Sequence, residues 1–240
     1  MMPPPTPQPG RAVVDGIKAC LGAPIIIMSA SFLGFGSLIQ ASNMGLWAGL
    51  FSTFFSWALP GQVITVEGVS LGASVASITL SVFLTNVRLL PLTVSLLPHL
   101  RATNTPKPLL YLASHLVAVT SWAVCMRRCP DLPEEERLPF FLGFACLLWV
   151  VSLVFTIIGF YAAGTMPPPI SLGLILLSPY YFLLVLVDGA RDRARVAALC
   201  LGLFFGPLFH LASPEWGLLA TGLIGGSLAY GLGRLGRKGN

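Results

Sequence analysis

The sequence predicts an all-α, polytopic transmembrane helical bundle, and two observations carry that prediction. Of the 240 residues, 55% are hydrophobic and 10% are charged, and the mean hydropathy is +0.82. A soluble domain carries about 25% charged residues, and one of this length cannot bury so much apolar surface. The apolar residues also gather in long runs, as the crossings of a bilayer require.

Eight apolar runs are candidate crossings, and the short segments between them hold most of the charge. The runs are Gly16–Ile39, Gly45–Leu59, Gln62–Leu97, Leu109–Met126, Leu138–Tyr161, Ile170–Val187, Val196–Leu211 and Trp216–Leu235. Residues 1–10 are proline-rich and are expected to form a disordered tail. Residues 11–240 are expected to form a single transmembrane transporter domain.

The region 45–97 is ambiguous, because a short run precedes one that is too long for a single crossing. It holds either two crossings with a broken helix or a re-entrant hairpin and one span. Cytoplasmic loops are enriched in Lys and Arg. With the N-terminus in the cytoplasm, eight crossings place eleven of these residues inside and two, Arg101 and Lys107, outside. A seven-crossing arrangement gives four inside and nine outside. We therefore expect about eight crossings, both termini cytoplasmic, in the cell inner (plasma) membrane.

The stretch "WALPGQVITVEG" (57–68) places a helix breaker and polar groups within an apolar run. Pro60 and Gly61 predict a break, with Gln62 beginning the next helix. Non-helical backbone at membrane depth is tolerated only where it is buried in protein or lines a wet cavity. The amides of such a helix start carry partial positive charge and suit a carboxylate, including that of an amino acid.

A second polar cluster lies in "TNVRLLP" (85–91). Asn86 is expected either to cap a broken helix or to bond between helices. Three roles are open for Arg88: pairing with Glu67, binding a substrate carboxylate, or extending to the membrane interface. Three roles are also open for Glu67: carrying a proton, meeting the ammonium group of the substrate, or serving as a structural carboxylate, since an ionised group at membrane depth needs a partner.

These residues define the predicted site, where the break at 60–62 meets the second cluster. The expected substrate-binding residues are Pro60, Gly61, Gln62, Asn86, Arg88, Phe35 and Trp57, and the expected proton-coupling residue is Glu67. Gln62 and the amides of the helix start would hold the carboxylate, and Phe35 and Trp57 would contribute apolar walls.

The chain resembles the AzlC family, the large permease subunit of branched-chain amino acid exporters. The resemblance lies in "WALPGQ" (57–62), "LGAS" (71–74), "TNVRLLP" (85–91) and "LLPHL" (96–100), in that order. Leu59-Pro60-Gly61 replaces the usual Ala-Gly turn, which suggests a Pro-Gly-Gln subgroup, and His115 stands in a span where members often carry an acidic pair. The resemblance implies export of branched-chain or similar apolar amino acids and a small membrane partner of the AzlD type.

Other functional classes find less support. "GVSLG" (68–72) matches a hydrolase nucleophile elbow but lies in an apolar helical stretch, where it fits a small-residue helix contact. The histidines are dispersed, Cys125 and Cys129 lack further ligands, and no phosphate-binding loop occurs. We expect no enzyme, metal, cofactor or nucleic-acid partner. A non-transporting scaffold or assembly subunit and an intramembrane enzyme remain the alternatives.

Overall fold

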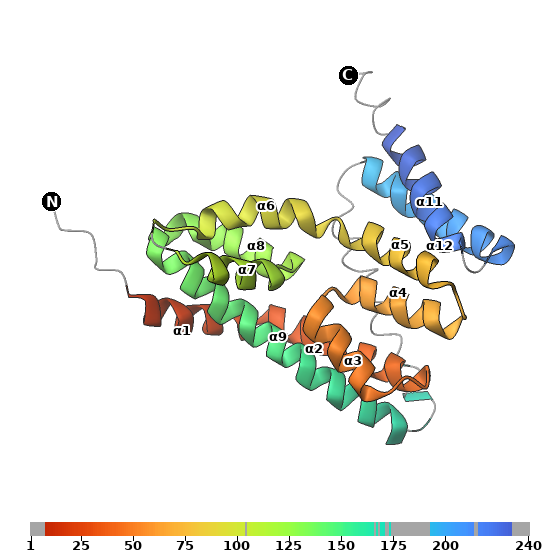
Figure 1. The fold of residues 1–240 in the computed structure, drawn as a ribbon, viewed down its shortest axis with the longest axis horizontal. Helices are drawn as coiled ribbons and strands as arrows, with labels where there is room; N and C mark the ends of the chain where they lie inside the picture. The colour runs from red at the N-terminus through yellow and green to blue at the C-terminus, as the bar shows by residue number, and fades with distance from the viewer. Residues whose placement is uncertain are drawn as a thin grey trace.

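A computed structural model describes residues 8–103, 105–165, 193–213 and 216–231, together with residues 167, 169, 170 and 173. All regular secondary structure in these residues is helical (Figure 1), which confirms the predicted all-α class. The helices are α1 (Pro9–Cys20), α2 (Ala23–Ala41), α3 (Leu46–Ser56), α4 (Leu59–Ser70), α5 (Val75–Asn86), α6 (Leu89–Leu100), α7 (Lys107–His115), α8 (Val119–Arg128), η1 (Cys129–Asp131), α9 (Glu134–Thr165), α11 (Arg193–Ala212), α12 (Gly217–Ala220) and η2 (Thr221–Gly225). The predicted tail falls mostly outside the described residues, and so does the predicted span Ile170–Val187.

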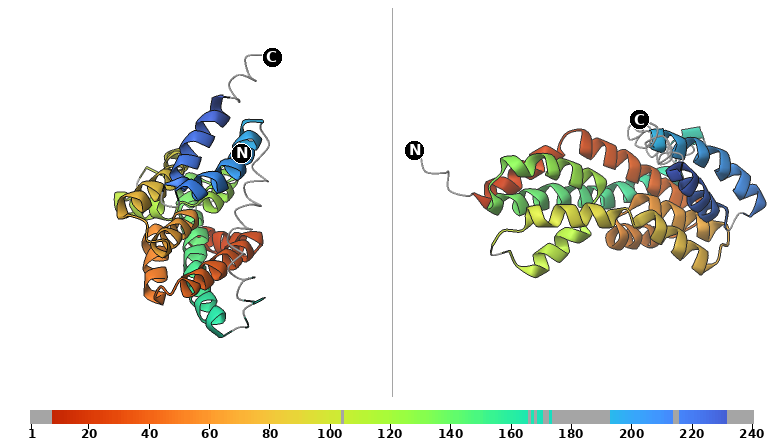
Figure 2. Two further views of the ribbon diagram at one scale, coloured as in Figure 1. Left: turned by 90° about the vertical axis from the view of Figure 1, so that its right-hand side faces the viewer. Right: turned by 90° about the horizontal axis from the view of Figure 1, so that it is seen from above.

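The scaffold of the fold is α9, with α1 and α2 packed along it (Figures 1 and 2). Its 32 residues extend about 48 Å, more than the roughly 30 Å of a bilayer core. Glycines let the backbones approach closely. Gly16 and Gly36 face the carbonyl oxygens of Phe140 and Thr156, and Gly143 and Gly159 face those of Val13 and Leu33. A side-chain carbon at any of these glycines would collide with the facing backbone.

Helices α3 and α4 form a short hairpin. They contain 11 and 12 residues, so they extend about 17 and 18 Å, which is too short to cross a bilayer core of roughly 30 Å. The chain reverses at Trp57 and Ala58, where Trp57 has a φ of +20°. The sequence predicted the break at Pro60 and Gly61. These residues instead lie in the first turn of α4, where a proline, which lacks an N–H group, is readily accommodated.

Helices α5 and α6 form one bent pair. Gly72, with a φ of +68°, lies in the turn that leads from α4 into α5. The axes of α5 and α6 differ by 42° across the break at residues 87–88, and the pair together is long and apolar enough to cross a membrane. The predicted run Gln62–Leu97 is therefore three helices, because it bends at both 71–74 and 87–88.

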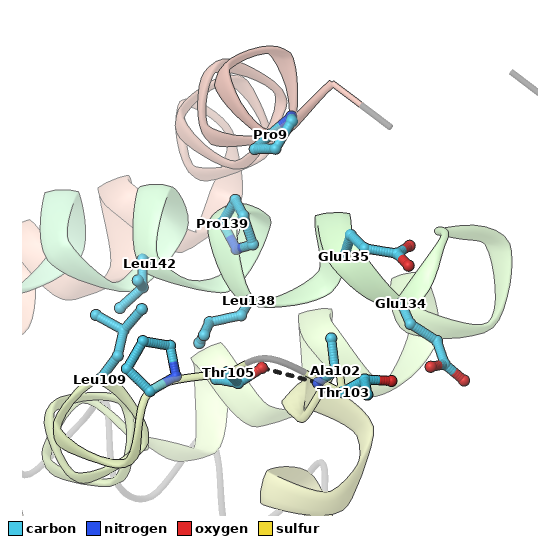
Figure 3. Close-up of a pocket in the computed structure, with 11 residues that line it drawn as sticks. Pro9, Ala102, Thr103, Thr105, Leu109, Glu134, Glu135, Leu138, Pro139 and Leu142 are labelled. Atoms are coloured by element: carbon cyan, nitrogen blue, oxygen red, sulfur yellow. Dashed lines mark hydrogen bonds between the residues drawn. The ribbon is translucent and has the colours of Figure 1, made fainter. Parts of the chain in front are cut away.

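Helices α7 and α8 form a second hairpin rather than the crossing predicted for Leu109–Met126. Leu109, at the start of α7, lines one cavity with Leu138 of α9 (Figure 3). Arg128, at the end of α8, lines another cavity with Phe140 of α9. Both ends of the hairpin thus lie beside the start of α9. The chain breaks at 116–118, and helices of 9 and 10 residues are each too short to cross.

Among the described residues, α2 and α9 are single helices that could cross a membrane, and the bent pair α5–α6 is a third candidate span. The prediction of about eight crossings is therefore not matched by long helices in this part of the chain. The sequence placed Arg101 and Lys107 on the opposite side of the membrane from most other Lys and Arg residues. In the structure, the segment that carries them lies at the same end of the molecule as the start of α9. The side that each terminus faces stays a prediction.

Candidate functional site

The tips of the two hairpins and the break in the bent pair α5–α6 come together against the middle of α9. The His115 Nε2–H group, at the end of α7, donates to the Phe54 carbonyl oxygen in α3, with an N···O distance of 2.9 Å. Gly61 in α4 faces the side-chain amide of Asn86 at the end of α5. We call residues 54–62, 86, 87 and 115–118, together with Trp149 and Ser152 of α9, the tip cluster.

Gln62 is almost completely enclosed within the tip cluster, with 1% of its surface exposed. Its Nε2 atom donates to Ser52 Oγ at 3.1 Å and to Thr53 Oγ1 at 3.0 Å. Its Oε1 atom is buried and has no hydrogen-bond partner. An unsatisfied buried acceptor costs about 1–3 kcal/mol, so this oxygen is a site at which a ligand with a donor group would be stabilised.

Asn86 is the last residue of α5, and its Oδ1 atom is likewise buried without a partner. A carbon added at Gly61 would lie 2.6 Å from Asn86 Nδ2, so the absence of a side chain at 61 is what lets the amide lie on the first turn of α4. No side chain caps the start of α4. The positive end of α4 and the negative end of α5 therefore lie side by side.

Two tryptophans hold the α3–α4 tip on α9. Trp57 is 4% exposed, and its Nε1–H group donates to Ser152 Oγ at 3.0 Å. The Trp149 ring packs against Phe54 with a centroid distance of 4.8 Å, while its Nε1 atom is buried and has no partner. Sequence analysis missed Trp149. The available signal was its indole N–H group within an apolar helix, since such a group normally finds a partner when buried.

The structure brings five predicted residues together and leaves three aside. Trp57, Pro60, Gly61, Gln62 and Asn86 all belong to the tip cluster.

Among the other three, Phe35 is fully buried on α2, where its ring packs edge-on against Phe32 at 6.2 Å. Arg88 is exposed at the start of α6, beside the break. Glu67 is exposed on α4, about 8 Å along the helix axis from Gln62, and its electrostatic neighbour is His210 of α11. Glu67 therefore does not contribute to the cluster.

Other groups that could carry chemistry lie elsewhere. Within the described residues, no group of three or more His, Cys, Asp or Glu side chains could hold a metal ion. Cys125 and Cys129 form a buried thiol pair with an S···S distance of 3.2 Å at the end of α8. The cavity of about 310 Å³ in Figure 3 has a mainly apolar lining with Glu134 and Glu135 at its edge. It lies beside the start of α9, away from the tip cluster.

This arrangement defines a class of protein: a helical membrane protein whose interrupted helices meet within the bundle, as they do at the binding sites of many transporters. The family model of the AzlC protein matches residues 24–166, a range that runs from α2 to α9 and includes the whole tip cluster. The chain belongs to the AzlC family, a family of membrane transporters. No curated protein and no solved structure matches it.

Proposed function

We propose that the protein exports branched-chain or similar apolar amino acids across the inner membrane, together with a small membrane subunit of the AzlD type. The observation that carries this proposal is the tip cluster, where three chain breaks meet and buried polar atoms lack partners. Membership of the AzlC family supports the transport of branched-chain amino acids, and the resemblance described above supports the partner.

The two hairpins give the proposal its geometry. In it, α3–α4 and α7–α8 enter the membrane from opposite faces without crossing, while α1–α2, α5–α6 and α9 cross. Irregular backbone at the hairpin tips is then enclosed by protein, as its unpaired polar groups require. An amino acid at the tips would lie near the middle of the membrane, where a small movement of either hairpin opens the site to one side.

The distribution of charge supports an orientation for this arrangement. Seven Lys and Arg residues lie on segments at the end of the molecule near the start of α9, namely Arg11, Lys18, Arg101, Lys107, Arg127, Arg128 and Arg137. Residues 19–87, which form both turns at the opposite end, contain none. The positive-inside rule then places the cationic end in the cytoplasm.

The test is leucine transport by the purified full-length chain, reconstituted in liposomes with the small membrane subunit. We expect release of preloaded tritiated leucine well above the rate of protein-free liposomes, and competition by valine and isoleucine. Leucine efflux equal to that of protein-free liposomes would overturn the proposal.

Glu67 is proposed to couple transport to protons, because a carboxylate within the membrane region can take up and release one. Replacing Glu67 with Gln keeps the shape of the side chain and removes its titration. We expect the variant to transport leucine at a rate that no longer changes with a pH gradient. If its pH dependence equals that of the wild type, the coupling role fails and the transport role stands.

A further inference from the structure

We propose that Gln62 Oε1 and Asn86 Oδ1 receive the ammonium group of the substrate, and that the site therefore selects amino acids with a free α-amino group. This inference rests on the proposed function. It also reverses the polarity expected from the sequence, in which Gln62 was to help hold the carboxylate.

The first step concerns the hydrogen bonds of Gln62. A glutamine amide has two N–H donors on one atom and an oxygen that only accepts. Both donors are accounted for by Ser52 Oγ and Thr53 Oγ1, the two contacts of Nε2. The remaining hydrogen-bonding atom of Gln62 is the acceptor Oε1, which is buried and has no partner. A carboxylate beside Oε1 could not bond to it, because both groups are acceptors. An ammonium group could donate an N–H hydrogen bond to Oε1.

The second step concerns Asn86, which supplies the same chemistry from another helix. Its Oδ1 atom is also buried and unpartnered. Its amide lies against Gly61, the residue that precedes Gln62 in the first turn of α4. Asn86 also ends α5, where the helix dipole is negative and favours a cation. Two neutral acceptors and a helix end together attract positive charge without a buried carboxylate.

The third step concerns the rest of the amino acid. An ammonium group between these oxygens brings its α-carboxylate close to the start of α4, where no side chain caps the backbone amides. The helix dipole favours an anion there. Opposite ends of two adjacent helices thus match the two charges of a zwitterion. A compound with only one of these charges would satisfy only one helix end.

A sodium ion shares the relevant chemistry, because it too is a cation that binds neutral oxygens. The two sources differ in what they require of the substrate. If the oxygens bind the substrate itself, blocking its amino group abolishes binding and sodium is dispensable. If they bind sodium, binding needs that ion, and an amino acid with a blocked nitrogen can still bind.

The experiment measures equilibrium binding of tritiated leucine to the full-length chain with its small subunit, for the wild type, Gln62→Glu and Gln62→Leu. A glutamate keeps an acceptor at Oε1, and the Ser52 and Thr53 hydroxyls can rotate to donate to its second oxygen. We expect Gln62→Glu to bind leucine within about threefold of the wild type or more tightly, and Gln62→Leu to bind at least about tenfold more weakly. Asn86→Asp is the matched change on α5 and should behave as Gln62→Glu does.

A second measurement needs no variant and covers the case in which Gln62→Glu does not fold. Unlabelled N-acetyl-leucine and 4-methylpentanoate, which both lack the ammonium group, should fail to displace leucine from the wild type. Replacing sodium with choline should leave leucine binding unchanged.

Three results would contradict the inference. One is loss of leucine binding in a folded Gln62→Glu or Asn86→Asp protein. That loss would mean that the carboxylate of the substrate, and not its ammonium group, lies beside these two side chains. The second is sodium-dependent binding with effective competition by N-acetyl-leucine, which would assign them to sodium. Either leaves the transport role standing. If the wild-type protein binds no leucine, the proposed function falls, and the inference falls with it.

Discussion

Two regions of the bundle differ in how their polar groups are satisfied: the contact between α2 and α9, and the tip cluster. Along the first, Gly36 and Gly159 allow backbone-to-backbone packing, and the buried Ser37 hydroxyl group donates to the Gly159 carbonyl oxygen at 3.1 Å. At the tip cluster, short helices end, and all three of the buried side-chain atoms that lack partners in the described residues are found. Close packing fixes the first region, while the second keeps polar atoms free for a ligand.

The largest effect on stability is expected at the close contact between α2 and α9. Gly36→Ala should destabilise the protein by about 3 kcal/mol, because its methyl group meets the Thr156 backbone, which cannot move without displacing α9. The measurement is the thermal unfolding midpoint of the purified protein. Gly45→Ala is the matched control, since nothing lies within 4 Å of a carbon added there. Equal midpoints for the two variants would mean that α2 and α9 are not packed this closely.

The same substitution at Gly61 should separate binding from stability. A methyl group at 61 displaces the Asn86 amide, which is a side chain and can move, so the folded protein should survive. We expect leucine binding to weaken by about tenfold or more, as the loss of a hydrogen bond to a charged group implies. Binding that matches that of Gly45→Ala would remove Asn86 from the site.

The link between the hairpin tips should have an intermediate effect. His115→Ala removes the hydrogen bond to the Phe54 carbonyl oxygen, which costs about 1 kcal/mol of stability. Because this bond joins the two hairpins, leucine transport should fall several-fold. His99→Ala is the control, since the His99 ring donates only within α6, to the Ser95 carbonyl oxygen at 2.9 Å. Similar transport by both variants would separate His115 from function.

The smallest effect is expected at Trp149. Trp149→Phe removes a buried indole N–H group that has no partner, so stability should be unchanged or slightly raised. Because this donor lies in the tip cluster, we expect leucine binding to fall by about threefold to tenfold while the unfolding midpoint stays unchanged. Trp122→Phe is the control, because the Trp122 N–H group is already bonded to Ser95 Oγ at 2.9 Å. Loss of stability in Trp149→Phe would show that the N–H group has a structural partner.

Sequence reasoning reached the class of the fold and part of the site. Composition suffices for the class, because apolar runs this long exclude a soluble core. The polar residues Gln62 and Asn86 stood out because such groups are costly within apolar helices, and the structure places both in the tip cluster. Their meeting follows from the hairpin path of α4 and α5, which brings the start of one helix beside the end of the other.

The path of the chain was beyond the sequence for physical reasons. Hydropathy measures how apolar a segment is and not where it turns, so a hairpin of two short helices reads like one crossing, as at Leu109–Met126. Pro60 suggested the break, although the chain reverses three residues earlier at Trp57. That turn is held by the bond to Ser152, nearly a hundred residues away, which no local pattern can reveal. The contact of His115 with Phe54 also joins residues far apart in sequence, at a separation of 61.

The central claim is that the substrate binds where the hairpin tips meet the broken span. The most direct test is a cryo-EM structure of the protein with its small subunit, an antibody fragment and bound leucine. We predict that the leucine nitrogen lies about 3 Å from Gln62 Oε1 and from Asn86 Oδ1. Leucine bound elsewhere, such as in the cavity beside Glu134, with both amide oxygens still unpartnered, would contradict the account.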